Sequence, residues 1–229
     1  MFFIDRYYFL LVVPALLLAS LAQMQVSTAF NKYNRMRTLN GITGETAARR
    51  ILNSYGIYDV NIVPIPGKLT DHFDPRDNTV RLSQDVFYGS TVAAVGVAAH
   101  EIGHVIQHNV DYAPLKLREV MIPITNIGSA ISMPMILLGI IMGAAPLVDL
   151  GIICFSMMAL FQLITLPVEF NASRRALKII EADGILQTEE ENRGAKKVLT
   201  AAALTYVAAL LVSVMQILRL VLLYHRNDD

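Results

Sequence analysis

The segment AAHEIGHVIQH, Ala98 to His108, places three histidines on one predicted helical stripe. Apolar residues recur around it at helical spacing, so we expect a helix from about Ser90 to Asn109. His100 and His104 are four residues apart and should therefore lie one turn apart on the same helix face. Two imidazoles in that arrangement can bind one Zn²⁺, and Glu101 beside them can accept a proton from water. This HExxH motif predicts a catalytic zinc site with Glu101 as the base.

The motif leaves two questions open, whether it binds metal and what the third ligand is. A short motif can occur by chance, and the alternative is a solvated polar helix face without metal. His108 lies eight residues after His100, about 12 Å along a helix, which is too far for both to share one ion. Glu169 follows an apolar run and is the best remaining carboxylate. Its alternative role is an interfacial carboxylate paired with Arg174 or Arg175.

The rest of the chain is too apolar for an ordinary soluble domain. Of its 229 residues, 54% are hydrophobic, and the mean hydropathy is +0.47. Four apolar runs approach the ~20 residues that span a bilayer core as a helix. The first is expected to be an uncleaved anchor, because it lacks the strongly basic start of a signal peptide. The runs cover Tyr7–Ala22, about Ile122–Met142, about Leu147–Leu166 and about Val198–Leu223, and Gly143–Pro146 (GAAP) is the turn between the second and third.

Charge indicates the orientation of these spans. Four spans place Gln23–Met121 and Pro167–Lys197 on the same side, and these segments carry 10 and 6 of the 19 Lys and Arg residues. The positive-inside rule puts both in the cytoplasm, so we expect a multi-pass protein of the cell membrane whose catalytic side is cytoplasmic. A net charge of zero gives no support for nucleic-acid binding. The single cysteine, Cys154, excludes an internal disulfide.

Local patterns fill in the remaining elements. Thr43 should cap a short helix, Val60–Ile65 and Thr79–Leu82 read as strands, and Thr188 with Glu191 forms a capping box that starts the last helix. The predicted fold is mainly α and integral to the membrane, with about four transmembrane helices and a small α+β, zincin-like cytoplasmic unit carrying the HExxH helix. The predicted segments are an N-terminal anchor (1–24), a cytoplasmic metallopeptidase unit (25–120), a transmembrane hairpin (121–168), a cytoplasmic helix with the third ligand (169–190) and a C-terminal transmembrane helix with its tail (191–229).

Two separated motifs carry a family resemblance. HEIGH, followed tens of residues later by E-x-x-A-S, resembles membrane-bound gluzincin proteases of the HtpX and CAAX-prenyl-protease type. The runs GKLTDHFDPRDNTVRLSQDVF, VAAHEIGHVIQH, LPVEFNASRRALKI and AAALTYVAALL are similar to the YugP-type predicted neutral zinc metallopeptidases of bacteria, over about Gly41 to Leu220. This resemblance implies His100, His104 and Glu169 as zinc ligands and Glu101 as the base. Ser173 stands where the HtpX pattern has an aspartate, and a serine can orient a ligand histidine only more weakly.

The residues that stabilise the transition state are less defined. A developing oxyanion needs a further donor, and Arg175, His72, His108 and Tyr206 are all candidates. Plainer roles compete with this one: surface pairing for Arg175, a loop position for His72 and helix packing for Tyr206. If Thr79–Leu82 is a sheet edge, an extended substrate could add to it, although a purely structural strand is an equal alternative.

Together these features favour a membrane-bound zinc metallopeptidase acting on a peptide or membrane-protein substrate at the lipid bilayer. The alternatives are a non-proteolytic scaffold or adaptor that retains a zinc site, and a transporter whose His/Glu cluster relays ions. A structural zinc site usually has four protein ligands, and only three good ones are present, which favours catalysis. The HExxH helix is polar enough to lie outside the spans, which argues against a transporter.

Overall fold

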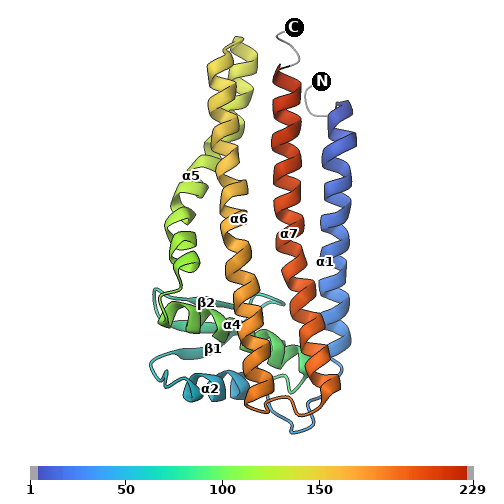
Figure 1. The fold of residues 1–229 in the computed structure, drawn as a ribbon, viewed down its shortest axis with the longest axis vertical. Helices are drawn as coiled ribbons and strands as arrows, with labels where there is room; N and C mark the ends of the chain where they lie inside the picture. Colours follow the sequence, from blue (N-terminus) through green and yellow to red (C-terminus); the bar gives the residue numbers. More distant parts are fainter. Residues whose placement is uncertain (1–4, 226–229) are drawn as a thin grey trace. The chain divides into compact units, whose positions relative to one another are not determined.

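The computed structural model describes residues 5–225, which form two compact units treated separately below. The first unit contains residues 5–23, 113–167 and 204–225, and the second contains residues 24–112 and 168–203. Figure 1 shows the elements in chain order.

Within residues 5–225, four helices are long and apolar enough to cross a membrane, as predicted. They are longer than the apolar runs because polar residues at their ends continue the helices. Helix α6 (Ala145–Ala182) continues without a break through position 168, which the sequence suggested as a boundary between two segments. The boundaries of the five predicted segments stay a prediction. The elements are a π-helical turn, η1 (Tyr8–Val12), leading into α1 (Val13–Tyr33), then α5 (Ala113–Met142), α6 (Ala145–Ala182) and α7 (Glu189–His225).

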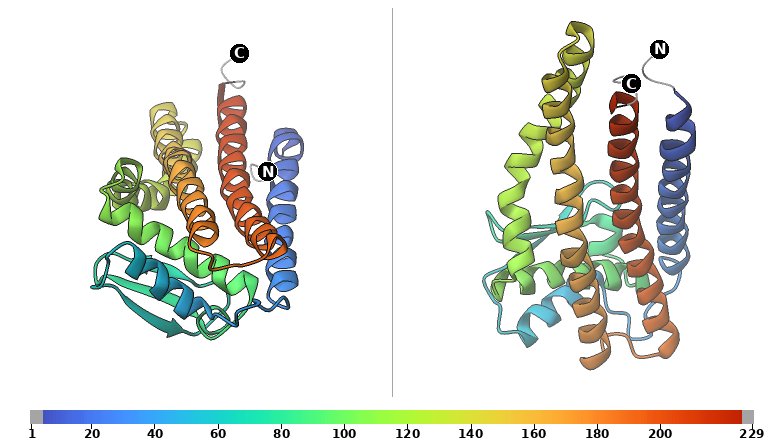
Figure 2. Two further views of the ribbon diagram at one scale, coloured as in Figure 1. Left: turned by 60° about the horizontal axis from the view of Figure 1, so that its bottom comes forward. Right: turned by 45° about the horizontal axis from the view of Figure 1, so that its top comes forward.

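In the first unit, α5 and α6 form a close helical hairpin (Figure 2). The predicted turn lies between them, with Gly143 in the left-handed region at φ +64°. A Cβ added to Gly139 would lie 2.8 Å from the backbone nitrogen of Val148, and one on Gly151 would lie 3.0 Å from that of Ile136. Glycines at these positions let the two backbones approach, as small residues do in membrane helix pairs.

The first unit also contains a buried ion pair between residues 214 positions apart in the chain. Arg219 donates to Asp5 Oδ2 from Nε at 2.8 Å and from the terminal guanidinium nitrogen at 2.6 Å. Arg219 is 5% exposed. The other Asp5 oxygen accepts the backbone N–H groups of Tyr7 and Tyr8. Asp5 therefore both starts the first helix and neutralises a charge on the last.

The second unit contains a three-stranded sheet with two helices beside it (Figure 2). The strand order is β1-β3-β2, with β1 parallel and β2 antiparallel to β3. β3 is therefore the central strand, so of the two alternatives drawn from the sequence the structure has the structural strand and not the sheet edge. β2 was not predicted, and it occupies one edge. The elements are α2 (Gly44–Ser54), β1 (Asn61–Ile65), β2 (His72–Asp74), β3 (Thr79–Ser83), α3 (Gln84–Phe87) and α4 (Val92–Asn109).

Caps define the helix starts in this unit. The Thr43 and Thr91 hydroxyls accept the backbone N–H groups of Thr46 and Ala94, so α2 starts as expected and α4 starts two residues later than expected. The predicted capping box is present: Glu191 N–H donates to Thr188 Oγ1, and the Glu191 carboxylate accepts the Thr188 N–H. The same carboxylate accepts the N–H of Leu39 at 2.7 Å.

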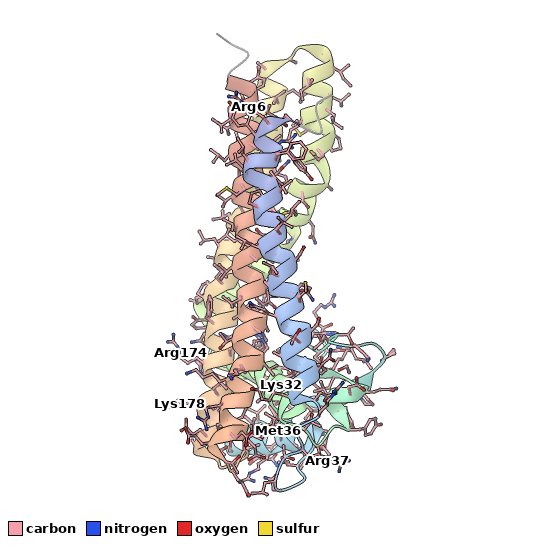
Figure 3. All side chains as sticks on the ribbon, turned by 90° about the vertical axis from the view of Figure 1, so that its right-hand side faces the viewer. Arg6, Lys32, Met36, Arg37, Arg174 and Lys178 are labelled. Atoms are coloured by element: carbon pink, nitrogen blue, oxygen red, sulfur yellow. The ribbon has the colours of Figure 1, made fainter. Side chains whose placement is uncertain are left out.

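The core of the second unit surrounds α4. This helix packs against α2, β2 and β3, and its faces toward them carry alanine, valine and isoleucine. The chain after α1 holds the start of α4, because the Val92 N–H donates to the Met36 carbonyl and Arg37 bridges to Thr91. Figure 3 labels Met36 and Arg37 in this connection. The largest fully buried apolar side chains are Ile51, Leu52, Leu82, Ile102, Ile106, Ile180, Ile185 and Leu199.

Candidate metal centre

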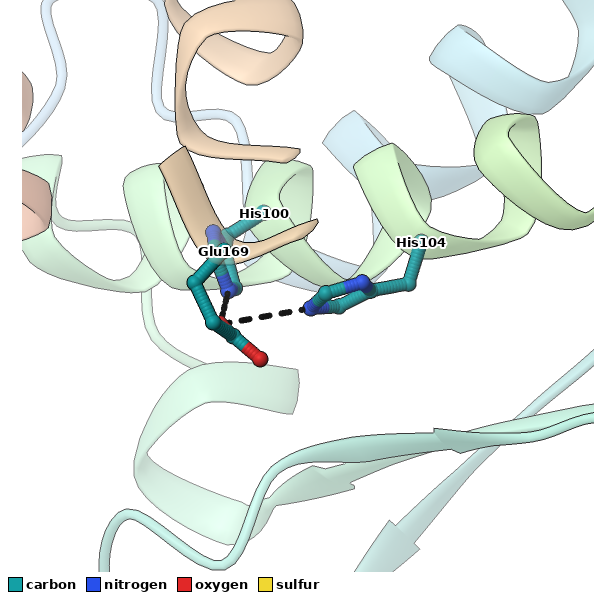
Figure 4. Close-up of side chains that lie close together, drawn as sticks. All are labelled: His100, His104 and Glu169. Carbon is teal, nitrogen blue, oxygen red and sulfur yellow. Dashed lines mark ion pairs between the residues drawn. The ribbon is translucent and has the colours of Figure 1, made fainter. Parts of the chain in front are cut away.

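The structure brings together the three residues expected to hold a metal, all in the second unit. His100 and His104 project from one face of α4, and Glu169 reaches them from α6 (Figure 4). The Glu169 Oε2 atom lies 3.3 Å from His100 Nε2 and 3.6 Å from His104 Nε2. Glu169 is 3% exposed and His104 is 9% exposed. The three side chains therefore form a shielded group facing a common point.

The spacing of these atoms fits a tetrahedral metal ion. Zinc at ~2.1 Å from each ligand places adjacent ligand atoms about 3.4 Å apart. The two measured imidazole–carboxylate distances agree with that edge length, and all three ligand atoms lie within 4.8 Å of one another. Two imidazoles and one carboxylate also form the donor set of known catalytic zinc sites. Among the described residues, this group contains no fourth His, Cys, Asp or Glu.

Gly103 explains how α6 comes close enough to α4 to deliver Glu169. A Cβ on Gly103 would lie 2.7 Å from the backbone oxygen of Ala172 and 3.1 Å from its carbonyl carbon. The glycine inside the HExxH motif therefore permits direct contact between the two helix backbones. Ala172 is fully buried at this contact.

Glu101 is buried beside the metal-binding group without belonging to it. It is 7% exposed, and burial raises the pKa of its carboxyl group to about 7. Nearby His100 and a hydrogen bond from the Phe73 backbone N–H oppose this rise in pKa. A carboxyl group with such a pKa can accept and return a proton near neutral pH.

Ser173 and Gln107 contact the Nδ1 atoms of the two histidines, whereas the Nε2 atoms face Glu169. Ser173 Oγ lies 3.1 Å from His100 Nδ1, so the serine occupies the orienting position expected of it. Gln107 Oε1 lies 3.0 Å from His104 Nδ1, and Gln107 Nε2 donates to Asn171 Oδ1 at 3.0 Å. Sequence reasoning missed Gln107 and Asn171. Gln107 lies three residues after His104 and therefore on the same face of α4, which was the one signal for it. Asn171 carried no comparable signal.

The remaining candidates for transition-state stabilisation belong to four different elements. Arg175 Nε donates to Asn171 Oδ1 at 2.8 Å, so this guanidinium group lies behind His104. His72 is exposed and belongs to β2 instead of the expected loop. The His108 ring contacts Phe73 edge-on, with 5.8 Å between ring centroids. Tyr206 lies on α7 in the first unit. The oxyanion role of all four stays a prediction.

A second carboxyl group lies near Glu101 on the approach to β2. Asp71 accepts hydrogen bonds from the Ser83 backbone N–H at 2.7 Å and from the Ser83 hydroxyl. Burial raises the pKa of Asp71 above its ordinary value, and the Ser83 hydrogen bonds oppose that rise. The residue thus joins the start of β2 to the end of β3.

Four helices able to span a membrane, together with a buried His–His–Glu group next to a second glutamate, define the layout of a membrane-associated metallohydrolase. The comparisons agree. The chain belongs to the family described as "Putative neutral zinc metallopeptidase", whose sequence model matches residues 8–225. It is also similar to the "Putative membrane protease YugP" of Bacillus subtilis (strain 168), with 48% identity over 219 residues, 96% of this chain and 97% of the relative. No solved structure matches the chain. The resemblance drawn from the sequence is thereby confirmed.

Proposed function

We propose that this protein is a membrane-bound zinc endopeptidase that hydrolyses peptide bonds with Glu101 as the general base. Membership of a zinc metallopeptidase family supports the reaction class. The observation that carries the proposal is the convergence of His100, His104 and Glu169 from two helices beside a buried glutamate. Peptides or exposed segments of membrane proteins are the proposed substrates.

His100 Nε2, His104 Nε2 and Glu169 Oε2 would hold the zinc ion. When bound, zinc supplies a Lewis acid that polarises a carbonyl oxygen and makes water more acidic. Three protein ligands are the usual number at a catalytic zinc site, whereas structural sites usually have four. Because the described residues provide three, the group favours catalysis over the alternative of a scaffold that retains a structural zinc.

Glu101 performs the proton transfers. Its pKa of about 7 leaves much of the carboxyl group ionised at neutral pH, so it can accept a proton from the attacking water. The protonated side chain then delivers that proton to the nitrogen of the leaving amine. The N–H of Phe73 holds the carboxylate in place during both transfers. Burial keeps bulk water from exchanging the proton between the two steps.

We further propose that the second unit faces the cytoplasm of the cell membrane. Basic side chains are concentrated in that unit, including Lys32, Arg174 and Lys178, which are labelled in Figure 3. Such a concentration is typical of cytoplasmic segments. α4 is not among the four candidate spans, which argues against an ion-relaying transporter.

Glu101→Gln separates metal binding from chemistry. The amide keeps the shape of the side chain but cannot accept a proton. We expect purified Glu101→Gln to retain the zinc content of the parent protein, measured by elemental analysis, and to lose cleavage of fluorescein-labelled casein and of mixed quenched fluorogenic peptides. Glu169→Ala should instead lose zinc. Parent-level cleavage by Glu101→Gln would exclude this role for Glu101, and full-affinity zinc in Glu169→Ala would remove Glu169 from the site.

A further inference from the structure

An ordered chain of hydrogen bonds lies behind one of the two histidines. Arg175 Nε donates to Asn171 Oδ1, and Gln107 Nε2 donates to the same oxygen. Gln107 Nε2 also donates to the Val168 backbone carbonyl at 2.8 Å. The other end of the Gln107 amide, Oε1, faces His104 Nδ1. All of these residues belong to the second unit.

At both ends of this hydrogen-bond chain, chemistry fixes which atom donates and which accepts. A guanidinium group has donors and no acceptor, so the Asn171 atom facing Arg175 must be its oxygen. A backbone carbonyl only accepts, so the Gln107 atom facing Val168 must be its nitrogen. Turning the Gln107 amide over would place its oxygen 2.8 Å from the Val168 oxygen and 3.0 Å from Asn171 Oδ1. Gln107 is fully buried, so bulk water could not compensate for such contacts.

We infer that Arg175, Asn171 and Gln107 are positioning residues that hold His104 in the Nδ1–H tautomer and so direct its Nε2 lone pair toward the metal position. The fixed Gln107 oxygen can only accept, and therefore Nδ1 of His104 must carry the proton. Nε2 is then the basic nitrogen, and it is the atom that faces Glu169. In metal-free protein the ionised Glu169 carboxylate beside Nε2 also only accepts and draws the proton toward Nε2, so the tautomer set by Gln107 must be tested with that carboxylate removed. The use of this tautomer in binding zinc rests on the proposed function.

The two histidines are held differently. The Ser173 hydroxyl beside His100 can either donate or accept, so it sets the ring orientation without dictating the tautomer. Only His104 is constrained by a chain that ends at a fixed charge. Because of this difference, the ring orientation and tautomer of His104 are preorganised for metal binding, whereas for His100 only the ring orientation is.

The tautomer can be measured in metal-free protein. We would label the histidines of full-length Glu169→Ala with ¹⁵N, remove metal and record two- and three-bond ¹⁵N–¹H correlations at about pH 9, above the ordinary imidazole pKa of ~6.5. This background removes the carboxylate that competes for a proton on Nε2. The His104 signals are assigned by their loss when His104→Gln is added. We expect Nδ1–H for His104 in Glu169→Ala and a shift toward Nε2–H, which free histidine prefers, when Gln107→Leu is added. Nε2–H in Glu169→Ala would overturn the inference.

Zinc affinity tests the chain with matched pairs. We expect Gln107→Leu and Asn171→Leu to lower the affinity about 10- to 100-fold in competition with a chromophoric chelator, as other partners of ligand histidines do. Asn171→Asp keeps an acceptor toward both neighbours and should stay within about 3-fold of the parent. Arg175→Met should weaken binding, whereas Arg174→Met, at an exposed neighbouring position, should not. Parent-level affinity in both leucine variants, or equal loss in Asn171→Asp and Asn171→Leu, would refute the chain's role.

The two experiments separate this inference from the proposed function. A parent protein that binds no zinc would contradict the proposed function, and the tautomer would still report on the hydrogen-bond chain. Zinc binding by the parent protein, together with the Nε2–H tautomer in metal-free Glu169→Ala, would contradict the chain alone. Thermal unfolding of each variant shows whether a loss of affinity reflects a loss of fold. Ser173→Ala should leave the His104 signals unchanged.

Discussion

Gly103→Ala should loosen the metal site without touching any ligand. The added Cβ would lie 2.7 Å from the Ala172 oxygen, where ordinary contact begins at 3.4 Å, so α4 and α6 must separate by up to the difference, 0.7 Å. Metal sites tolerate errors of about 0.2 Å in ligand distance. Glu169 lies one turn before Ala172 on α6, so its carboxylate must move by a comparable amount. We expect zinc affinity to fall at least about 10-fold, which corresponds to ~1.4 kcal/mol of binding free energy.

Overpacking should also destabilise the fold. Forcing a methyl group into a packed core costs about 1–3 kcal/mol, which is partly offset by the roughly 1 kcal/mol that alanine gains over glycine in a helix. Gly96→Ala is the matched control, because a Cβ there would meet the Ala195 Cβ at an ordinary 3.5 Å. It should therefore keep its zinc and unfold at the same temperature or higher.

The assay is chelator competition and thermal unfolding on the parent protein and both variants in the same detergent. Gly103→Ala should bind zinc most weakly and unfold first. Parent-level zinc affinity in Gly103→Ala, with unfolding no earlier than in Gly96→Ala, would refute the argument that this backbone contact positions Glu169.

Asp71→Asn tests the buried carboxyl group near Glu101: since burial raises the Asp71 pKa in the folded protein, its contribution to stability is complete below the unfolded pKa and is lost as pH rises through the folded value. The variant should thus gain stability relative to the parent as the pH rises above the ordinary aspartate pKa of ~3.9, and a difference that is flat or falls with pH in paired melts would contradict burial. Asp5→Asn keeps an acceptor for the helix start but removes the carboxylate that accepts two hydrogen bonds from buried Arg219. Removing one partner of a buried ion pair costs about 3–5 kcal/mol, and Asp5→Asn/Arg219→Leu should recover most of it in detergent unfolding curves. Removing zinc with 1,10-phenanthroline should abolish cleavage and lower the melting temperature, because zinc at 100 times its Kd adds about 2.7 kcal/mol; unchanged melting would show that no metal joins α4 to α6.

Features set by local chemistry were predictable from the sequence. Thr43, Thr188 and Glu191 cap their helices as expected, because a cap depends on residues within one turn. The four apolar helices were predictable because bilayer thickness fixes the length of a span. The HExxH pair was predictable because two ligands on one helix need only helical periodicity.

Features set by distant contacts were not. β2 was missed because it has only three residues and turn-like neighbours, and its pairing partner, β3, supplies the register. The position of β3 in the middle of the sheet depends on that missing strand. Gln107 and Asn171 carry no motif of their own, and their meaning appears only when α6 lies against α4. Glu169 could be proposed from its place after a span, and the backbone contact at Gly103 that brings it to the histidines required the structure.

The pairing of Asp5 with Arg219 has a consequence for biosynthesis. The two residues are 214 positions apart, so at 5–20 residues per second a ribosome needs roughly 10 to 40 s to deliver the second after the first. Throughout that interval Asp5 lacks the Arg219 guanidinium group with which it pairs in the complete fold. A chain that stops before α7 cannot form this pair, so the connection between the first and the last helix is made only after α7 has been synthesised.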